Sequence, residues 1–239
     1  MSRCFADVLP EWPLEDVEAG LASATSGDVL RALETAQAGG RLEARDYMAL
    51  LSPVASPYLE DMARLAREVT LRQFGRAVQL FTPLYLANYC TNQCVYCGFN
   101  TKNHIHRSML TMDEVEAEGK AIAATGLRNI LLLTGDAPKL TGPDYIAEAA
   151  RRLRPYFPSI GIEVYSMTED EYRMLVEAGV DSFTMFQETY NEGLYARLHP
   201  AGPSAIPLPS SRPDRPPHGD ALRQAWSSCS ALTSGGRDA

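Results

Sequence analysis

The chain has 239 residues, of which 45% are hydrophobic, so it is long enough to bury one large core or two smaller ones. Its net charge of −8, from 30 acidic and 22 basic residues, argues against a nucleic-acid partner, whose phosphates attract basic surfaces. No apolar stretch reaches the ~18 residues of a membrane span and residues 1–10 lack a signal-peptide pattern, so we expect a cytoplasmic protein without a membrane partner.

Residues 1–77 predict an N-terminal helical region. Apolar side chains recur at helical spacing from Tyr58 to Phe74, and Gly75 supplies a stop. A shorter helix is predicted over residues 28–36. We expect these helices to pack against a larger domain.

Residues 78–203 alternate between apolar strands and amphipathic helices, which predicts a parallel sheet covered by helices. Strands are expected at 78–88, 129–134, 160–165 and 182–186. Helices are expected at 111–124, 143–153, 168–179 and 190–198, the first and third opened by capping boxes. No G-x-G-x-x-G follows a strand, which argues against a dinucleotide-binding fold. A complete eight-stranded barrel takes ~250 residues, so we expect an α/β fold with about four βα units of a TIM-type barrel.

Residues 204–239 break this pattern, because they are rich in proline and serine and have no helical or strand period. Such a segment buries too little apolar surface to offset its ordering entropy. We expect a disordered or aberrant tail, the product of a truncated or frameshifted gene, with a genuine disordered linker as the alternative. A chain without the later strands would leave the barrel open, so an inactive fragment is also an alternative.

Three of the five cysteines carry most of the functional information. Cys90, Cys94 and Cys97 form a C-x3-C-x2-C cluster directly after the first predicted strand, where βα barrels place their chemistry. Iron–sulfur clusters normally take four cysteines, so three would leave one iron of a [4Fe–4S] cluster open to a small molecule. Cys4 and Cys229 are isolated, and the odd cysteine count argues against a disulfide framework.

Zinc is the main alternative for these thiols. Either His104 or His106 could complete a Cys3His set, which is a normal tetrahedral zinc site. Structural zinc sites usually bring their ligands in two separated pairs, whereas these three cysteines lie together, so we favour the iron–sulfur interpretation. Unrelated buried thiols are a further alternative.

The cysteine spacing, with Tyr96 directly before the last cysteine, resembles the signature of the radical S-adenosylmethionine (SAM) enzymes. Three further stretches resemble the 2-iminoacetate synthases (ThiH), the tyrosine lyases of thiamine thiazole biosynthesis. They are Phe81-Thr-Pro-Leu-Tyr-Leu-Ala-Asn-Tyr-Cys90, Cys97-Gly-Phe-Asn-Thr101, and Gln187-Glu-Thr-Tyr190 with Tyr195-Ala-Arg197. The similarity covers roughly residues 3–203.

This resemblance implies a [4Fe–4S] cluster and SAM as cofactors. SAM would be reduced to 5′-deoxyadenosine and methionine, and the Cα–Cβ bond of L-tyrosine would be cleaved to 2-iminoacetate (dehydroglycine) and p-cresol. A reduced flavodoxin- or ferredoxin-type protein would donate the electron, and thiazole synthase is a further expected partner. A radical SAM enzyme with another substrate is the alternative, for example the tyrosine lyase type of hydrogenase maturation. That relative carries a second cysteine motif near its C-terminus, whereas Cys229 stands alone here.

The resemblance also implies site residues. Cys90, Cys94 and Cys97 would hold the cluster, and Tyr96 or its backbone would pack near the SAM adenine. The strand end formed by Thr134, Gly135 and Asp136 would receive the SAM amino group, Asp136 through charge-assisted hydrogen bonds.

Three weaker candidates complete the predicted site. Glu163 lies in an apolar strand, where an unpaired carboxylate is costly, so we expect a contact with the SAM ribose or a neighbouring Lys or Arg. Gln187 ends the fourth predicted strand and is a candidate ligand contact, while the adjacent Glu188 could instead favour the start of the next helix. Arg197 could bind a carboxylate of SAM or tyrosine, or be an ordinary surface residue.

Overall fold

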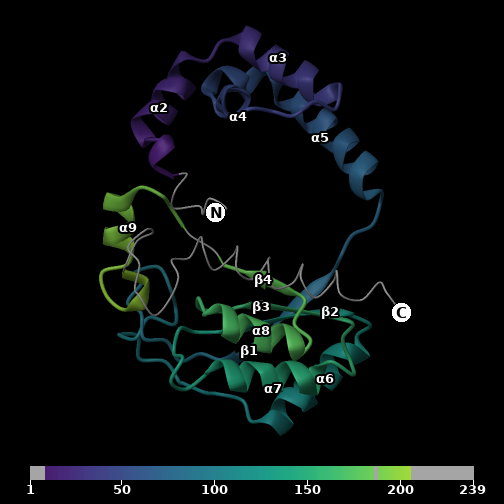
Figure 1. Cartoon of the computed structure of the whole chain (residues 1–239), viewed down its shortest axis with the longest axis vertical. Coiled ribbons are helices and arrows are strands. Elements are labelled where there is room, and N and C mark those ends of the chain that lie inside the picture. The colour runs from purple at the N-terminus through teal and green to yellow at the C-terminus, as the bar shows by residue number, and fades with distance from the viewer. Residues whose placement is uncertain (1–8, 186–187, 206–239) are drawn as a thin grey trace. The chain divides into compact units, whose positions relative to one another are not determined.

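The computed structural model describes residues 9–185 and 188–205 (Figure 1). The chain divides into two compact units, one spanning Asp7–Val78 and the other holding the chain from Gln79 onward. The predicted division into a helical region (1–77), a βα region (78–203) and a tail (204–239) stays a prediction, and all but the first two residues of that tail lie outside the described residues.

The first unit is helical in its described part. It contains η1 (Leu9–Glu11), α2 (Leu14–Ser23), α3 (Ser26–Gln37), α4 (Ala44–Leu51), η2 (Pro53–Tyr58) and α5 (Leu59–Phe74). Its small core is built around Val29, Ala49 and Ala55. Helix α5 ends at Gly75, whose φ of 67° lies in the region that glycine adopts without strain. Helices α3 and α5 were predicted individually, and α2 and α4 were not.

The second unit contains a four-stranded sheet in its described part. The strands are β1 (Phe81–Ala87), β2 (Asn129–Thr134), β3 (Ser159–Glu163) and β4 (Ser182–Thr184). The helices are α6 (Met112–Ala124), α7 (Pro143–Leu153), α8 (Glu169–Glu177), α9 (Glu192–Leu198) and the short η3 (Pro203–Ala205). Both predicted capping boxes are present, at Thr111 with Glu114 and at Thr168 with Glu171.

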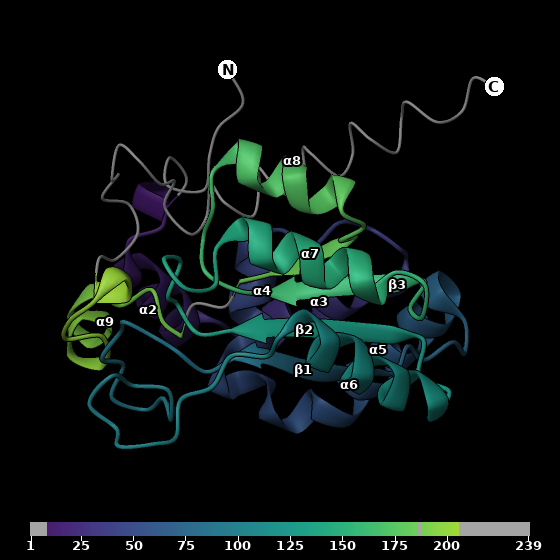
Figure 2. The ribbon, with the colours of Figure 1, turned by 90° about the horizontal axis from the view of Figure 1, so that it is seen from below.

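The order of the strands identifies the architecture. All neighbouring strands are parallel and follow the order β1-β2-β3-β4, so each βα unit adds its strand beside the previous one. A doubly wound sheet would reverse direction after its first strands, whereas a TIM-type barrel keeps this sequential order. Helices α6, α7 and α8 accordingly cover one face of the sheet (Figure 2). The predicted partial barrel is confirmed.

The core of this unit lies between the sheet and those three helices. Leu86, Leu132 and Ile160 from the strands and Leu153 from α7 are fully buried. Gly119 lets α6 and α7 approach closely, because a Cβ there would lie 2.2 Å from a methyl carbon of Leu153. No helix of the described residues is long and apolar enough to cross a membrane.

Candidate functional site

The carboxyl ends of the parallel strands meet at one edge of the sheet, and the predicted site residues follow those ends. The cysteine loop follows β1, the loop of residues 134–136 follows β2, and Glu163 ends β3. Glu163 pairs in register with Leu133 and Thr184, so these strand ends are level. Figure 2 shows the long loop after β1 and helix α9 at the same end of the sheet.

The cysteine loop presents three free thiols. Cys94 is buried, while Cys90 and Cys97 are partly exposed. The Cys94 amide oxygen accepts from the Cys97 N–H at 3.2 Å, which closes a tight turn between these two ligand candidates. Burial, followed by the charges of the neighbouring Cys90 and Cys97, raises the pKa of Cys94 to about 11, so the three sulfurs would repel one another when ionised.

The described residues contain no preformed set of ligands for the alternative, a zinc ion. In the part of the chain that the structure describes, no three His, Cys, Asp or Glu side chains converge as they would around one ion. His104 and His106 are exposed on the loop beyond Cys97. A cluster spreads its thiolates over several irons, so it does not require the sulfurs to meet at one point.

The loop after β2 packs directly on the start of the cysteine loop. A Cβ on Gly135 would lie 2.1 Å from the Tyr89 carbonyl oxygen, so only glycine fits there. Thr91 donates both its N–H (2.9 Å) and its hydroxyl (2.8 Å) to the Asp136 carbonyl oxygen. The Asp136 carboxylate accepts from the Asn92 side-chain amide at 3.0 Å. Two of the predicted SAM-binding residues therefore also hold the cysteine loop in place.

Arg107 fixes the other end of the cysteine loop. Its guanidinium donates to the carbonyl oxygens of Asn88 (2.7 Å), Phe99 (2.9 Å) and Asn100 (2.8 Å). The residue just before the loop and two residues just after Cys97 are thus held by one side chain. The planar guanidinium suits this role because its donors have a fixed geometry.

The residues present fit an iron–sulfur cluster with SAM beside it. Soft thiolates are the ligands that such clusters take. The Thr134 hydroxyl oxygen is buried at the end of β2 and has no hydrogen-bond partner among the described residues. A buried polar atom without a partner is costly, and a ligand amino group at this strand end would supply a donor.

The other predicted residues have mixed positions. The Tyr96 hydroxyl lies 2.7 Å from His199 Nε2, and burial together with the carboxylate of Glu188 raises the pKa of Tyr96. Glu163 is half-buried and forms no ion pair within the described residues, so its Lys or Arg alternative gains no support. Arg197 is exposed in the last turn of α9. Gln187 lies outside the described residues.

Sequence reasoning missed several residues that contact the cysteine loop. His199 is 3% exposed and Asn92 is 4% exposed, so both are buried polar residues. Arg107 was not among the predicted site residues. Asn92 lies between two of the cysteines, and that position could have indicated a role in holding the cysteine loop. His199 is more than a hundred residues from its partner Tyr96, and nothing in the local sequence connects them.

Comparison with known proteins now identifies the class. The model of the Radical SAM superfamily matches residues 84–205, which is just over half of the chain, and the chain belongs to that superfamily. Enzymes of this superfamily use a [4Fe–4S] cluster and SAM. The matched region contains all three cysteines.

Individual relatives show which members of the superfamily the chain resembles. The chain is 39% identical to the 2-iminoacetate synthase of Escherichia coli over 200 residues, 84% of this chain and 52% of that protein. It is 32% identical to the 3-methylornithine synthase of Methanosarcina acetivorans over 67% of this chain and 46% of that protein. The crystal structure of HydG, a maturase of the [FeFe]-hydrogenase, matches with a TM-score of 0.78 at 25% identity, over 92% of this chain and 48% of that chain. The chain spans about half the length of the curated relatives it matches.

Proposed function

We propose that this protein is a radical SAM lyase that cleaves the Cα–Cβ bond of L-tyrosine to 2-iminoacetate and p-cresol. The observation that carries the proposal is the cysteine loop, which presents three free thiols and whose start lies against the strand end of β2 at the carboxyl edge of a sequential parallel sheet. The 39% identity to a 2-iminoacetate synthase supports this substrate. The product would serve thiamine thiazole biosynthesis.

The residues have distinct tasks in this proposal. Cys90, Cys94 and Cys97 hold the cluster as thiolates, and Thr134 with Asp136 accepts hydrogen bonds from the SAM amino group. When bound and reduced, the cluster and SAM together supply a radical able to take a hydrogen atom from the substrate. The chain itself binds the cofactors, orients them and keeps water from the reacting atoms.

Further contacts belong to the same proposal. Tyr96 lies beside the adenine, Glu163 contacts the ribose, and Gln187 and Arg197 contact SAM or tyrosine. The partners are a reduced flavodoxin- or ferredoxin-type donor and thiazole synthase, and the compartment is the cytoplasm. An iron–sulfur enzyme fits a reducing compartment, where thiols are not oxidised to disulfides.

The test is anaerobic reconstitution with iron and sulfide, followed by dithionite reduction with SAM and tyrosine. We expect both 5′-deoxyadenosine and p-cresol. 5′-Deoxyadenosine without p-cresol would mean that the protein cleaves SAM but acts on a substrate other than tyrosine. The likeness to a 3-methylornithine synthase favours this alternative. Stoichiometric zinc in place of iron and sulfide would contradict both the tyrosine lyase and a radical SAM enzyme with another substrate.

A further inference from the structure

After α9 the chain returns to the cysteine loop. We call residues 198–205 the strap. The Val95 N–H donates to the Leu198 carbonyl oxygen at 3.0 Å, and the Gln93 N–H donates to the Ala201 carbonyl oxygen at 3.0 Å. Both donors flank Cys94, so the strap is bonded to the backbone on either side of the buried ligand candidate.

Asn92 joins the strap to the loop after β2. Its side-chain oxygen accepts from the Ser204 N–H at 2.8 Å, while its side-chain nitrogen donates to Asp136. Gly202 has a φ of 100°, and a Cβ there would lie 2.5 Å from the Asn92 side-chain oxygen. The strap can approach Asn92 this closely only because residue 202 is glycine.

His199 is the one strap side chain whose hydrogen bonds fix the cysteine turn, as far as the described residues show. Its Nδ1 lies 3.0 Å from the Tyr195 carbonyl oxygen, and a carbonyl can only accept, so Nδ1 carries a hydrogen. In the neutral ring Nε2 is then an acceptor, and it accepts from the Tyr96 hydroxyl at 2.7 Å.

Packing holds the His199 ring in this orientation. The Tyr195 ring stacks on it with centroids 4.0 Å apart, and the Tyr96 ring meets it edge-on at 5.5 Å. Glu188 Oε2 lies 3.6 Å from Nε2. An imidazole stacked and hydrogen-bonded in this way presents one fixed acceptor to Tyr96, which lies in the turn between Cys94 and Cys97.

We infer that the strap holds the cysteine loop in its cluster-binding shape before the cluster arrives, and that His199 is a positioning residue acting through the Tyr96 hydroxyl. The inference deepens the proposed function, because the shape matters only if these thiols hold a cluster. A loop ordered in advance loses less conformational entropy when it binds. The strap therefore slows cluster loss and speeds cluster uptake.

Three variants test the contact. Tyr96→Phe removes only the donor hydroxyl, His199→Phe removes the acceptor and keeps an aromatic ring, and His199→Gln keeps an acceptor oxygen near the place of Nε2. Tyr47→Phe, an exposed tyrosine on α4, is the control for loss of a hydroxyl. The first readout is the rate at which the reconstituted cluster is lost to an iron chelator. The second is hydrogen exchange of the Gln93 and Val95 amides in the cluster-free full chain.

We expect Tyr96→Phe and His199→Phe each to speed cluster loss about fivefold to tenfold, the factor that one lost hydrogen bond gives. The Tyr96 hydroxyl also has Glu188 and Cys94 as neighbours, so the double variant should lose its cluster no faster than Tyr96→Phe alone, and His199→Gln should restore most of the slow loss. The Gln93 and Val95 amides should exchange faster in both Phe variants, and their exchange rates should be unchanged in the Tyr47→Phe control.

Other outcomes overturn the inference. Additive effects in the double variant would mean that the two side chains act separately. Cluster loss from Tyr96→Phe as slow as from the unaltered protein would mean that the Tyr96 hydroxyl does not brace the loop, whether or not SAM binding weakens. Absence of a cluster in the unaltered protein would contradict the proposed function, while amide exchange in the cluster-free chain would still decide whether the strap holds the loop.

Discussion

Three thiols within one short loop repel one another when ionised, and a protein tolerates this only with compensation. Cys94 shows the problem most clearly, because burial and its two neighbours raise its pKa to about 11. The thiolate and not the thiol is the metal ligand, so a cluster bound by these cysteines would have to compensate for their charge. Hydrogen bonds hold the loop in place from three directions, through Arg107, the loop after β2 and the strap, so that the three thiols stay close together.

Cys94→Ser should remove the cluster. The serine oxygen is a poor substitute for the soft thiolate that iron–sulfur clusters take. Iron and acid-labile sulfide per chain after reconstitution give the measurement. Cys229→Ser is the matched control, and a full complement of iron and sulfide in Cys94→Ser would contradict the assignment of the ligand.

Gly135→Ala should weaken both the fold and cluster uptake. The added methyl group would meet the Tyr89 carbonyl oxygen at 2.1 Å and push the start of the cysteine loop away. Overpacking of this kind costs about 1–3 kcal/mol, which denaturant unfolding would detect. Gly193→Ala is the control, since its Cβ would meet only an ordinary contact of 3.6 Å. Equal stability and equal cluster uptake in the two variants would refute the close approach.

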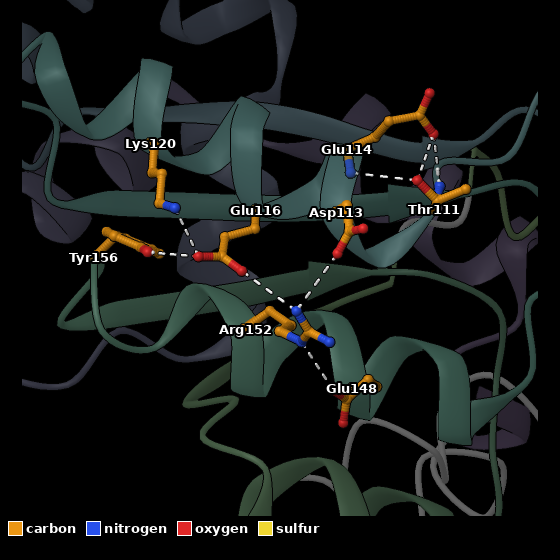
Figure 3. Close-up of polar contacts among 8 residues, drawn as sticks. All are labelled: Thr111, Asp113, Glu114, Glu116, Lys120, Glu148, Arg152 and Tyr156. Carbon is orange, nitrogen blue, oxygen red and sulfur yellow. Dashed lines mark hydrogen bonds and ion pairs between the residues drawn. The ribbon is translucent and has the colours of Figure 1, made fainter.

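At the scale of elements, helices α6 and α7 are joined on their outer side by charged residues. Glu116 on α6 lies 2.8 Å from Lys120, accepts from the Tyr156 hydroxyl at 2.8 Å and pairs with Arg152 on α7 at 3.3 Å (Figure 3). Arg152 also pairs with Glu148 at 3.2 Å. The hydrogen bond from Lys120, followed by the one from Tyr156, lowers the pKa of Glu116 to about 2.

Glu116→Gln should therefore lower stability in a pH-dependent way. A carboxyl whose pKa falls on folding stabilises the folded state above its unfolded pKa, and this contribution is lost as pH falls through its folded pKa. The difference in unfolding free energy between the parent and Glu116→Gln should be largest at neutral pH and should shrink as pH falls from 4.5 towards 2. Glu118→Gln, exposed on the same helix, should show no such trend. A difference independent of pH would contradict the ionic role.

The elements that were predictable depend on local signals. Strand β2 begins and ends where its apolar run does, and the capping boxes at Thr111 and Thr168 mark the starts of α6 and α8. Strand β1 starts later than its apolar run, because the ladder with β2 begins at Phe81 opposite Asn129 and leaves Val78 and Leu80 outside it. The strap was not predicted, since backbone groups form most of its contacts and any sequence can supply them.

At the scale of the whole molecule, the sequential parallel sheet explains why the site is where it is. Each βα unit brings one loop to the same edge, so the cysteine loop and residue 135 become neighbours although they are distant in sequence. The three cysteines and the class of fold could be predicted, because cysteine spacing and apolar periodicity can be recognised within short stretches of the sequence. The acceptor for Tyr96 could not, because only the completed fold brings His199 to it.

The central claim is that three cysteines of this chain hold a cluster with one iron open to SAM. The most direct measurement is the electron paramagnetic resonance spectrum of the reconstituted, dithionite-reduced protein with and without SAM. We predict a reduced [4Fe–4S] signal whose g-values change when SAM is added, because SAM becomes a ligand of the open iron. A cluster signal that SAM leaves unchanged, or a protein that takes up zinc and forms no cluster, would contradict the account.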